Sequence, residues 1–330
     1  VNGAKLTDNN YADLLFGKND TYTLGMAAIS GGVITDSDRE VTLTKKEGLI
    51  EDPILVAKTV EVNGVKIAYL MYNGFTRGFN EELNAAFGQF KSEGATELVL
   101  DLRYNPGGSV ESSRLLASMI YGTHNGDLYI RQRWNDKIQS QFKKEQIEDY
   151  FASKTDKGTA INTLNLPRVF VLATGSSASA SELIMNGLAP YINVFHIGER
   201  TRGKNEFSVT MVDDIDNDYI YSAARENKID PNNTWAMQPL MGRNENADGF
   251  SDYTSGLAPN VELKEDLSKL GVLGDPNEAL FARAIQEITG VSAKRDFTVK
   301  IPIEEISNSK MFTLLKDNMY LDKELDVNLP

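Results

Sequence analysis

The sequence predicts an α/β protein, in which a domain of alternating strands and helices follows a small, mostly β module. Along residues 54–292, short apolar runs typical of buried strands alternate with amphipathic stretches typical of helices. Short helices that join buried strands imply parallel pairing, so we expect a parallel-rich mixed sheet built from βαβ units. Residues 1–53 instead show brief alternation of apolar and polar residues between turns, which indicates a separate β module.

The N-terminal module is predicted to hold two strands and one short helix. Residues 21–24 and 40–44 are rich in Thr, Val and Leu, and a Gly-Gly pair lies between them. Residues 10–16 fit a short helix. A charged, proline-bearing stretch at 51–53 marks the predicted boundary with the next domain.

The second domain, residues 54–292, carries the alternating pattern, and the chain becomes polar beyond it. We therefore expect a polar C-terminal extension over residues 293–330. Apolar runs and helical periodicity give the following elements. The predicted strands cover residues 65–72, 98–102, 168–173 and 193–198, and the predicted helices cover 81–92, 111–120, 180–188 and a stretch near 143–151.

The composition is that of a globular protein with an excess of acidic residues. The 330 residues carry a formal net charge of −13 at pH 7. A nucleic acid or an anionic membrane surface would require a basic face, so we expect neither as a partner. No apolar run is long enough to cross a bilayer and the first residues carry no targeting signal, so we expect a soluble fragment or mature form. With no Cys, the sequence excludes a disulfide framework and a thiolate nucleophile.

Three loops follow the C-terminal ends of predicted strands, where α/β folds place their sites. Their sequences are RYNPGG at 103–108, TGSSASASE at 174–182 and ERTRGK at 199–204. The glycine pair of the first loop and the first turn of the helix after the second loop both offer backbone N–H groups. Together these groups could hold an oxyanion, with a nucleophile between them.

Ser179 in the second loop is the candidate nucleophile, and it requires a base. The two histidines are poorly placed, because His124 follows a helix and His196 lies within a strand. Lys204 ends the third loop at the same edge, where a lysine that has lost its hydration could accept the serine proton. The sequence contains no HExxH, GxSxG or P-loop motif and no histidine cluster for a metal. The residues thus favour a Ser-Lys dyad without a metal or cofactor.

Each of these features also has a structural explanation. Ser179 and Glu182 fit the S-x-x-E capping box, so the serine could be only a helix N-cap. The glycine pair could be a plain strand-to-helix turn. Lys204 could be a solvated surface charge, and Asp101 with Arg103 could be a structural ion pair.

At these three loops the sequence resembles the C-terminal processing, or tail-specific, peptidase family of Ser-Lys serine proteases. The blocks LVLDLRYNPGG, SSASASEL and IGERTRGKN match the family's three signature blocks in the family's order, and the resemblance covers about residues 54–292. It implies a crotonase-like peptidase domain. It also implies a serine endopeptidase that hydrolyses peptide bonds in unfolded or C-terminally exposed polypeptides, with no cofactor.

The same resemblance assigns roles to individual residues. It implies Ser179 as the nucleophile and Lys204 as the general base. It implies an oxyanion hole made by the N–H groups of Ala180 and of the pair Gly107 and Gly108, with Gly108 favoured. Further motif positions, implied to orient the dyad, are Glu182 and Thr201.

The sequence departs from the family's pattern at two positions. Pro190 stands where many relatives have an acidic residue, and Ser208 stands where some have a glutamine four residues after the lysine. The departures leave the orientation of Lys204 open. Ser208 is kept as a candidate third member of the site.

Residues 1–53 resemble the later part of a PDZ domain, through VNGAKLT and REVTLT, without its carboxylate-binding loop. Segments 235–239 and 252–259 resemble the envelope-exported bacterial branch of the family. The resemblance therefore implies a periplasmic or membrane-anchored location in the cell envelope, through a segment outside this chain. Two alternatives stay open: an inactive relative that acts as a peptide-binding or scaffolding module, and, from fold analogy alone, a crotonase-type acyl-CoA enzyme.

Overall fold

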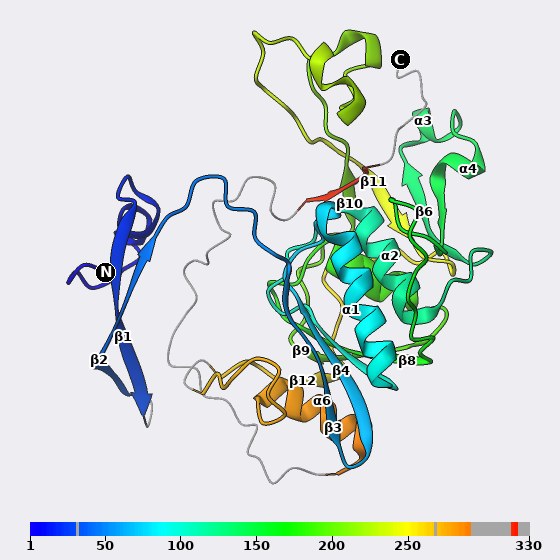
Figure 1. Cartoon of the computed structure of the whole chain (residues 1–330). Helices are drawn as coiled ribbons and strands as arrows, with labels where there is room; N and C mark the ends of the chain where they lie inside the picture. The colour runs from blue at the N-terminus through cyan, green and yellow to red at the C-terminus, as the bar shows by residue number, and fades with distance from the viewer. Residues whose placement is uncertain (31–32, 267–268, 292–317, 323–330) are drawn as a thin grey trace.

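The computed structural model describes residues 1–30, 33–266, 269–291 and 318–322 (Figure 1). Its largest sheet has the strand order β12-β9-β8-β5-β4-β3. Five of these strands run parallel, and β3 pairs antiparallel with β4 at one edge. The strands are β3 (Ile54–Val62), β4 (Val65–Tyr72), β5 (Glu97–Asp101), β8 (Arg168–Ala173), β9 (Asn193–Gly198) and β12 (Val261–Glu262).

Helices cover both faces of this sheet, because its strands are apolar on both sides. In β4, Leu70 and Tyr72 lie in a core shared with α1 (Asn80–Glu93), α2 (Val110–Tyr121) and α5 (Ala180–Leu188). The alternate residues Ile67, Tyr69 and Met71 lie in a second core that includes α6 (Ala279–Thr289). This alternation follows from the period of two along a strand, and it explains why the run reads as continuously apolar.

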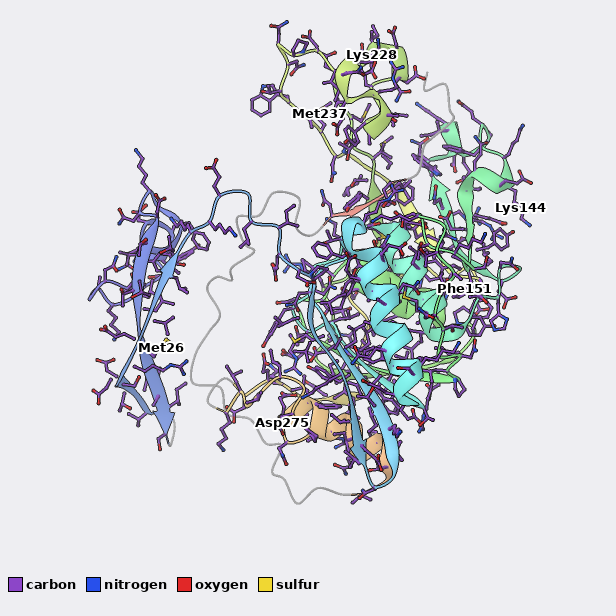
Figure 2. All side chains as sticks on the ribbon, in the orientation of Figure 1. Met26, Lys144, Phe151, Lys228, Met237 and Asp275 are labelled. Atoms are coloured by element: carbon purple, nitrogen blue, oxygen red, sulfur yellow. The ribbon has the colours of Figure 1, made fainter. Side chains whose placement is uncertain are left out.

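A second sheet has the order β13-β10-β11-β6-β7. Between β10 and β11 the chain leaves the sheet in a projecting segment that holds η3 (Ile215–Asn217) and η4 (Ala223–Lys228); Figure 2 shows Lys228 and Met237 on it, away from the main sheet. The strands of the second sheet are β6 (Leu128–Trp134), β7 (Glu148–Tyr150), β10 (Glu206–Ser208), β11 (Leu240–Glu245) and β13 (Met319–Tyr320).

The N-terminal module is a hairpin that stands apart from the two sheets, with Met26 on its first strand (Figures 1 and 2). The antiparallel strands β1 (Thr21–Ser30) and β2 (Val33–Thr44) are longer than predicted, and η1 (Ala12–Phe16) lies where a short helix was expected. Most side chains of the hairpin are exposed. Its relation to a PDZ domain stays a prediction.

The predicted α/β class with parallel-rich pairing is confirmed, and the predicted strands and helices of the second domain lie within two residues of the observed ones, with one exception. The helical stretch expected near 143–151 is wrong beyond Ile147: α4 covers only Lys144–Ile147, and β7 follows it. The chain turns into a strand here because β7 pairs antiparallel with β6 and the buried Glu148 carboxylate accepts a hydrogen bond from Arg131 at 2.8 Å. The sequence did not predict β3, β6, α3 (Asp136–Gln139), β10 to β13 or α6.

The C-terminal region, 293–330, lies mostly outside the described residues, but residues 318–322 are described and belong to the body of the protein. Met319 is fully buried and Leu321 nearly so, and both lie in the main core. Among the described residues, no helix has the length and apolar character needed to cross a membrane.

Candidate active site

The three predicted loops meet at the C-terminal ends of β5, β8 and β9. The Ala178 N–H donates to the Asn105 carbonyl at 3.2 Å, which joins the second loop to the first. The Arg202 N–H donates to the Ser177 carbonyl at 3.0 Å, which joins the third loop to the second. Parallel pairing brings the three strand ends to one edge, so residues that lie far apart in sequence form one site there.

Ser179 lies at the N-cap of α5 in a conformation that L residues rarely adopt, with φ of 62° and ψ of −114°. Its backbone N–H donates to the Glu182 carboxylate at 2.9 Å, which forms one half of the predicted capping box. The Ser179 side chain also faces the backbone of Glu182, as in a capping box, but its fully buried Oγ makes no hydrogen bond to any described residue. A buried hydroxyl without a partner on a strained backbone is typical of a functional position rather than of a cap.

The buried Glu182 carboxylate links the serine loop to the lysine loop. Its Oε2 accepts the N–H of Ser179 at 2.9 Å and the N–H of Lys204 at 2.8 Å. Its Oε1 accepts the N–H of Gly203 at 2.6 Å and the hydroxyl of Thr201 at 2.5 Å. Because one oxygen serves both residues, the backbone nitrogens of Ser179 and Lys204 lie within two hydrogen-bond lengths of each other.

Burial raises the pKa of Glu182, and the four hydrogen bonds to the carboxylate act in the opposite direction. The Thr201 hydroxyl also accepts the N–H of Leu257 at 2.7 Å, so its own proton is left for Glu182. The structure thus brings together both residues that were implied to support the site. They act on the backbone that carries Ser179 and Lys204.

The glycine pair packs directly against the serine. A Cβ built on Gly107 would lie 2.6 Å from the Ser179 Cβ and 2.9 Å from the Ala180 nitrogen, so only glycine allows this approach. The Gly107 N–H donates to the Asn105 side chain at 2.9 Å, whereas the N–H groups of Gly108 and Ala180 have no acceptor among the described residues. These two donors flank Ser179 and are the candidates for an oxyanion hole.

Replacing Gly107 with alanine is expected to lower kcat/KM by about 10²-fold or more, because the new methyl group would displace the Ser179 backbone. The matched control is Gly158→Ala. Gly158 also has a positive φ, 86°, but a Cβ there would meet no atom within 4 Å. Steady-state peptide cleavage by the two variants separates the contact with Ser179 from backbone strain, and equal activities would contradict a role for the close approach.

Lys204 reaches toward the C-terminal strand. Its Nζ donates to the Asn318 Oδ1, and the Asn318 Nδ2 donates to the Gln238 Oε1 at 3.1 Å. The candidate third residue, Ser208, lies at the end of β10, the strand that follows Lys204. The Ser208 Oγ lies 3.1 Å from the Met319 carbonyl and 3.3 Å from the Gln238 Oε1.

The sequence alone did not reveal Asn105, Gln238 and Asn318. Asn105 holds the first loop, because its side chain accepts the Gly107 N–H and donates to the Tyr72 carbonyl at 2.8 Å. Its place in the RYNPGG block was a signal that could have identified it. Gln238 lies in the segment 235–239, which was singled out only by its family resemblance, and Asn318 lies in a segment with no motif. The second sheet brings both near Lys204.

The remaining candidates take structural positions. Arg103 is fully buried, and its guanidinium forms ion pairs with Asp101 at 2.7 Å and with Glu278 at 3.0 Å. Asp101 ends β5 and Glu278 is the N-cap of α6, so Arg103 links this strand to this helix. His196 lies within β9, and burial lowers its pKa. Over residues 1–30, 33–266, 269–291 and 318–322, no three acidic or histidine side chains are grouped in a way that could hold a metal ion.

The chain is similar to known peptidases in sequence and in structure. The family model described as "Peptidase family S41" matches residues 66–240, which include all three loops. A carboxyl-terminal-processing protease from Picosynechococcus is 28% identical over 170 residues, or 52% of this chain and 36% of that protein. A tail-specific protease from Haemophilus influenzae is 23% identical over 228 residues, or 69% of this chain and 29% of that protein. The match therefore spans about a third of the length of these relatives.

Among solved structures, one from Bacteroides fragilis, described as an S41 protease, has a TM-score of 0.72 and 28% sequence identity. The match covers 88% of this chain and 72% of that one. This coverage is larger than the segment that the family model matches, residues 66–240. The loops that converge on Ser179 thus lie within a recognised peptidase domain, and the chain belongs to peptidase family S41.

Proposed function

We propose that the protein is a serine endopeptidase of the C-terminal processing type that uses Ser179 as nucleophile and Lys204 as general base. One observation carries the proposal: a single buried carboxylate oxygen of Glu182 accepts the backbone N–H groups of both residues. This shared acceptor fixes the two loops relative to each other at the edge where the oxyanion donors lie. The names of the relatives, carboxyl-terminal-processing and tail-specific protease, support the same reaction class.

The reaction follows the general course of acyl transfer. The Ser179 Oγ attacks the scissile carbonyl carbon while neutral Lys204 takes the hydroxyl proton, and the carbonyl oxygen becomes an oxyanion. The N–H groups of Gly108 and Ala180 stabilise this charge. The C–N bond then breaks, Lys204 gives the proton to the departing amine, and an ester remains on Ser179. Water, deprotonated by Lys204, hydrolyses the ester and restores the serine.

The proposed substrates are polypeptides whose chain is extended at the cleavage site, because the nucleophile is buried and reaches only backbone that enters the loops. Unfolded proteins and exposed C-terminal tails meet this requirement. A location in the bacterial cell envelope is part of the same proposal and rests on the family resemblance. No part of the proposed reaction uses a metal ion.

A second candidate is a peptide-binding family member without peptidase activity. It is favoured by one observation, the absence of a hydrogen bond between the Ser179 Oγ and any described residue, including Lys204. In this case peptides would occupy the same loops without reaction. The two candidates differ in turnover, which a single assay measures.

The test is hydrolysis of unfolded casein by the wild-type chain, with and without EDTA, beside the double variant S179A/K204M. The proposed peptidase gives cleavage that resists EDTA and is absent from the double variant. If the wild-type chain binds casein without cleaving it, the binding module is the correct function. Cleavage by the double variant would show that another site is responsible.

A further inference from the structure

The C-terminal strand β13 contacts both halves of the candidate active site. On one side it pairs in parallel with β10, the strand that follows Lys204, and the Leu321 N–H donates to the Ser208 carbonyl at 3.1 Å. On the other side the Tyr320 N–H points to the Gly108 carbonyl at 3.4 Å, next to the oxyanion donors. Because Met319 is fully buried in the main core, this strand is an integral part of the body rather than a loosely attached tail.

A directed chain of hydrogen bonds runs from Lys204 through two amide side chains. The Lys204 Nζ donates to the Asn318 Oδ1, across 114 positions of sequence. The Asn318 Nδ2 donates to the Gln238 Oε1 at 3.1 Å, and the Gln238 Nε2 donates to the Thr210 Oγ1 at 2.8 Å. Asn318 thus presents its oxygen to the lysine and its NH2 group to Gln238. Each bond in the chain therefore fixes the orientation of the next.

Backbone hydrogen bonds fix the end of this hydrogen-bond chain that is farthest from Lys204. Gln238 and Thr210 lie where the segment between β10 and β11 leaves the sheet, and there Met211 and Met237 exchange two backbone hydrogen bonds, of 2.8 and 2.9 Å. This short antiparallel bridge fixes the positions of both neighbours. Gln238 is thus a rigid support for Asn318, although most of the projecting segment lies away from the site.

The chemistry of a lysine base explains what such a chain would do. A neutral amine has two N–H bonds and one lone pair, and only the lone pair can accept the serine proton. An acceptor that holds one N–H fixes the rotation of the amine and so directs the lone pair. Without that acceptor the amine is one of the most flexible groups in proteins, and productive orientations become rare.

We propose that Asn318 is a positioning residue for the general base: the C-terminal strand supplies the acceptor that orients the Lys204 amine, and Gln238 fixes the orientation of that acceptor. The inference rests on the proposed peptidase function and adds residues that lie outside its signature blocks.

The test uses two variants of Asn318 with opposite electrostatic effects and follows the pH dependence of kcat for casein-derived peptides. Asn318→Asp adds a negative charge that favours the ammonium form of Lys204, so the ascending limb of the profile is expected to move up by about one pH unit or more. Asn318→Leu has a similar size but no acceptor, so the limb is expected to move to lower pH while the plateau falls by about tenfold or more. The neighbouring elements carry several titratable or charged groups: Glu182 on α5, Glu206 on β10, Arg243 and Glu245 on β11, Tyr320 on β13, and Arg202, Tyr253 and Asp322 in the adjoining loops.

Met319→Leu is the control, because it alters the packing of β13 and leaves the side-chain amides of Asn318 and Gln238 in place. It is expected to leave the ascending limb in place, whatever its effect on stability. If neither Asn318 variant moves the limb, or if both move it in one direction and Met319→Leu moves it in that direction too, Asn318 is only structural. A gain of activity in Asn318→Leu would overturn the proposal in another way, since it would make β13 an inhibitory segment.

These outcomes are distinct from a failure of the proposed function. That failure appears in the wild-type chain, as an absence of cleavage or as cleavage that survives the loss of Ser179. Failure of the positioning role instead leaves an active wild-type enzyme that depends on Ser179. The ascending limb of its pH profile then does not move when residue 318 is replaced.

Discussion

Ser179→Ala is expected to reduce casein cleavage by about 10⁴-fold or more, because the variant retains the oxyanion donors but has no atom to form the acyl-enzyme. The free energy of unfolding is expected to stay within about 0.5 kcal/mol of the wild-type value or to rise. The reason is that the buried Ser179 Oγ makes no hydrogen bond to a described residue, and removal of an unpaired polar atom costs little. Casein cleavage and thermal unfolding of the same preparation check both parts.

The matched control is Ser176→Ala in the same loop. Ser176 is partly exposed and its N–H donates to the Thr174 hydroxyl, so the loop keeps that contact when the side chain is shortened. This control is expected to cleave casein at close to the wild-type rate. A stable Ser179→Ala protein with undiminished activity would remove Ser179 from the mechanism, whereas an unfolded one would mean that the serine is the helix cap after all.

Lys204→Met is expected to lower kcat by about 10³-fold or more, because methionine retains much of the aliphatic length of the lysine and provides no base. The Lys204 N–H donates to Glu182 from the backbone, so this link between the loops persists in the variant. The measurement is single-turnover cleavage, with the variant S179A/K204M in parallel. Since nucleophile and base act in one step, the double variant is expected to lose little more than either single variant.

Lys157→Met, at an exposed turn position, controls for the loss of a positive charge from this acidic protein. It is expected to leave the rate unchanged. Losses in the two single variants that multiply in the double variant would mean that Ser179 and Lys204 act independently, which is incompatible with a dyad.

The sequence predicted the parts of the fold whose signals are local. The runs that became β4, β5, β8 and β9 are apolar on both faces, and the loops after three of them carry the residues that meet at the site. The glycine pair and the SxxE pattern were also local, and both mark positions where the backbone of the site is fixed.

The parts that were missed depend on distant pairing. β10, β12 and β13 have two or three residues each, too few for a periodic pattern, and they form only because a neighbouring strand offers its free edge. The same is true of the stretch at 148–150, where helical propensity was outweighed by pairing with β6. Asn318 and Gln238 could not be predicted for this reason, since their contacts with the site exist only after the second sheet has formed.

The place of β13 has a consequence for the order in which this protein is made. Ser179 and Lys204 leave the ribosome well before Asn318, which lies 114 residues after the lysine. Until residues 318–322 emerge and pair with β10, a nascent chain contains Ser179 and Lys204 but lacks the Asn318 side chain that accepts from the lysine amine and the backbone contact with Gly108. A growing chain of this protein therefore carries an incomplete site until the 114 positions from Lys204 to Asn318 have been synthesised.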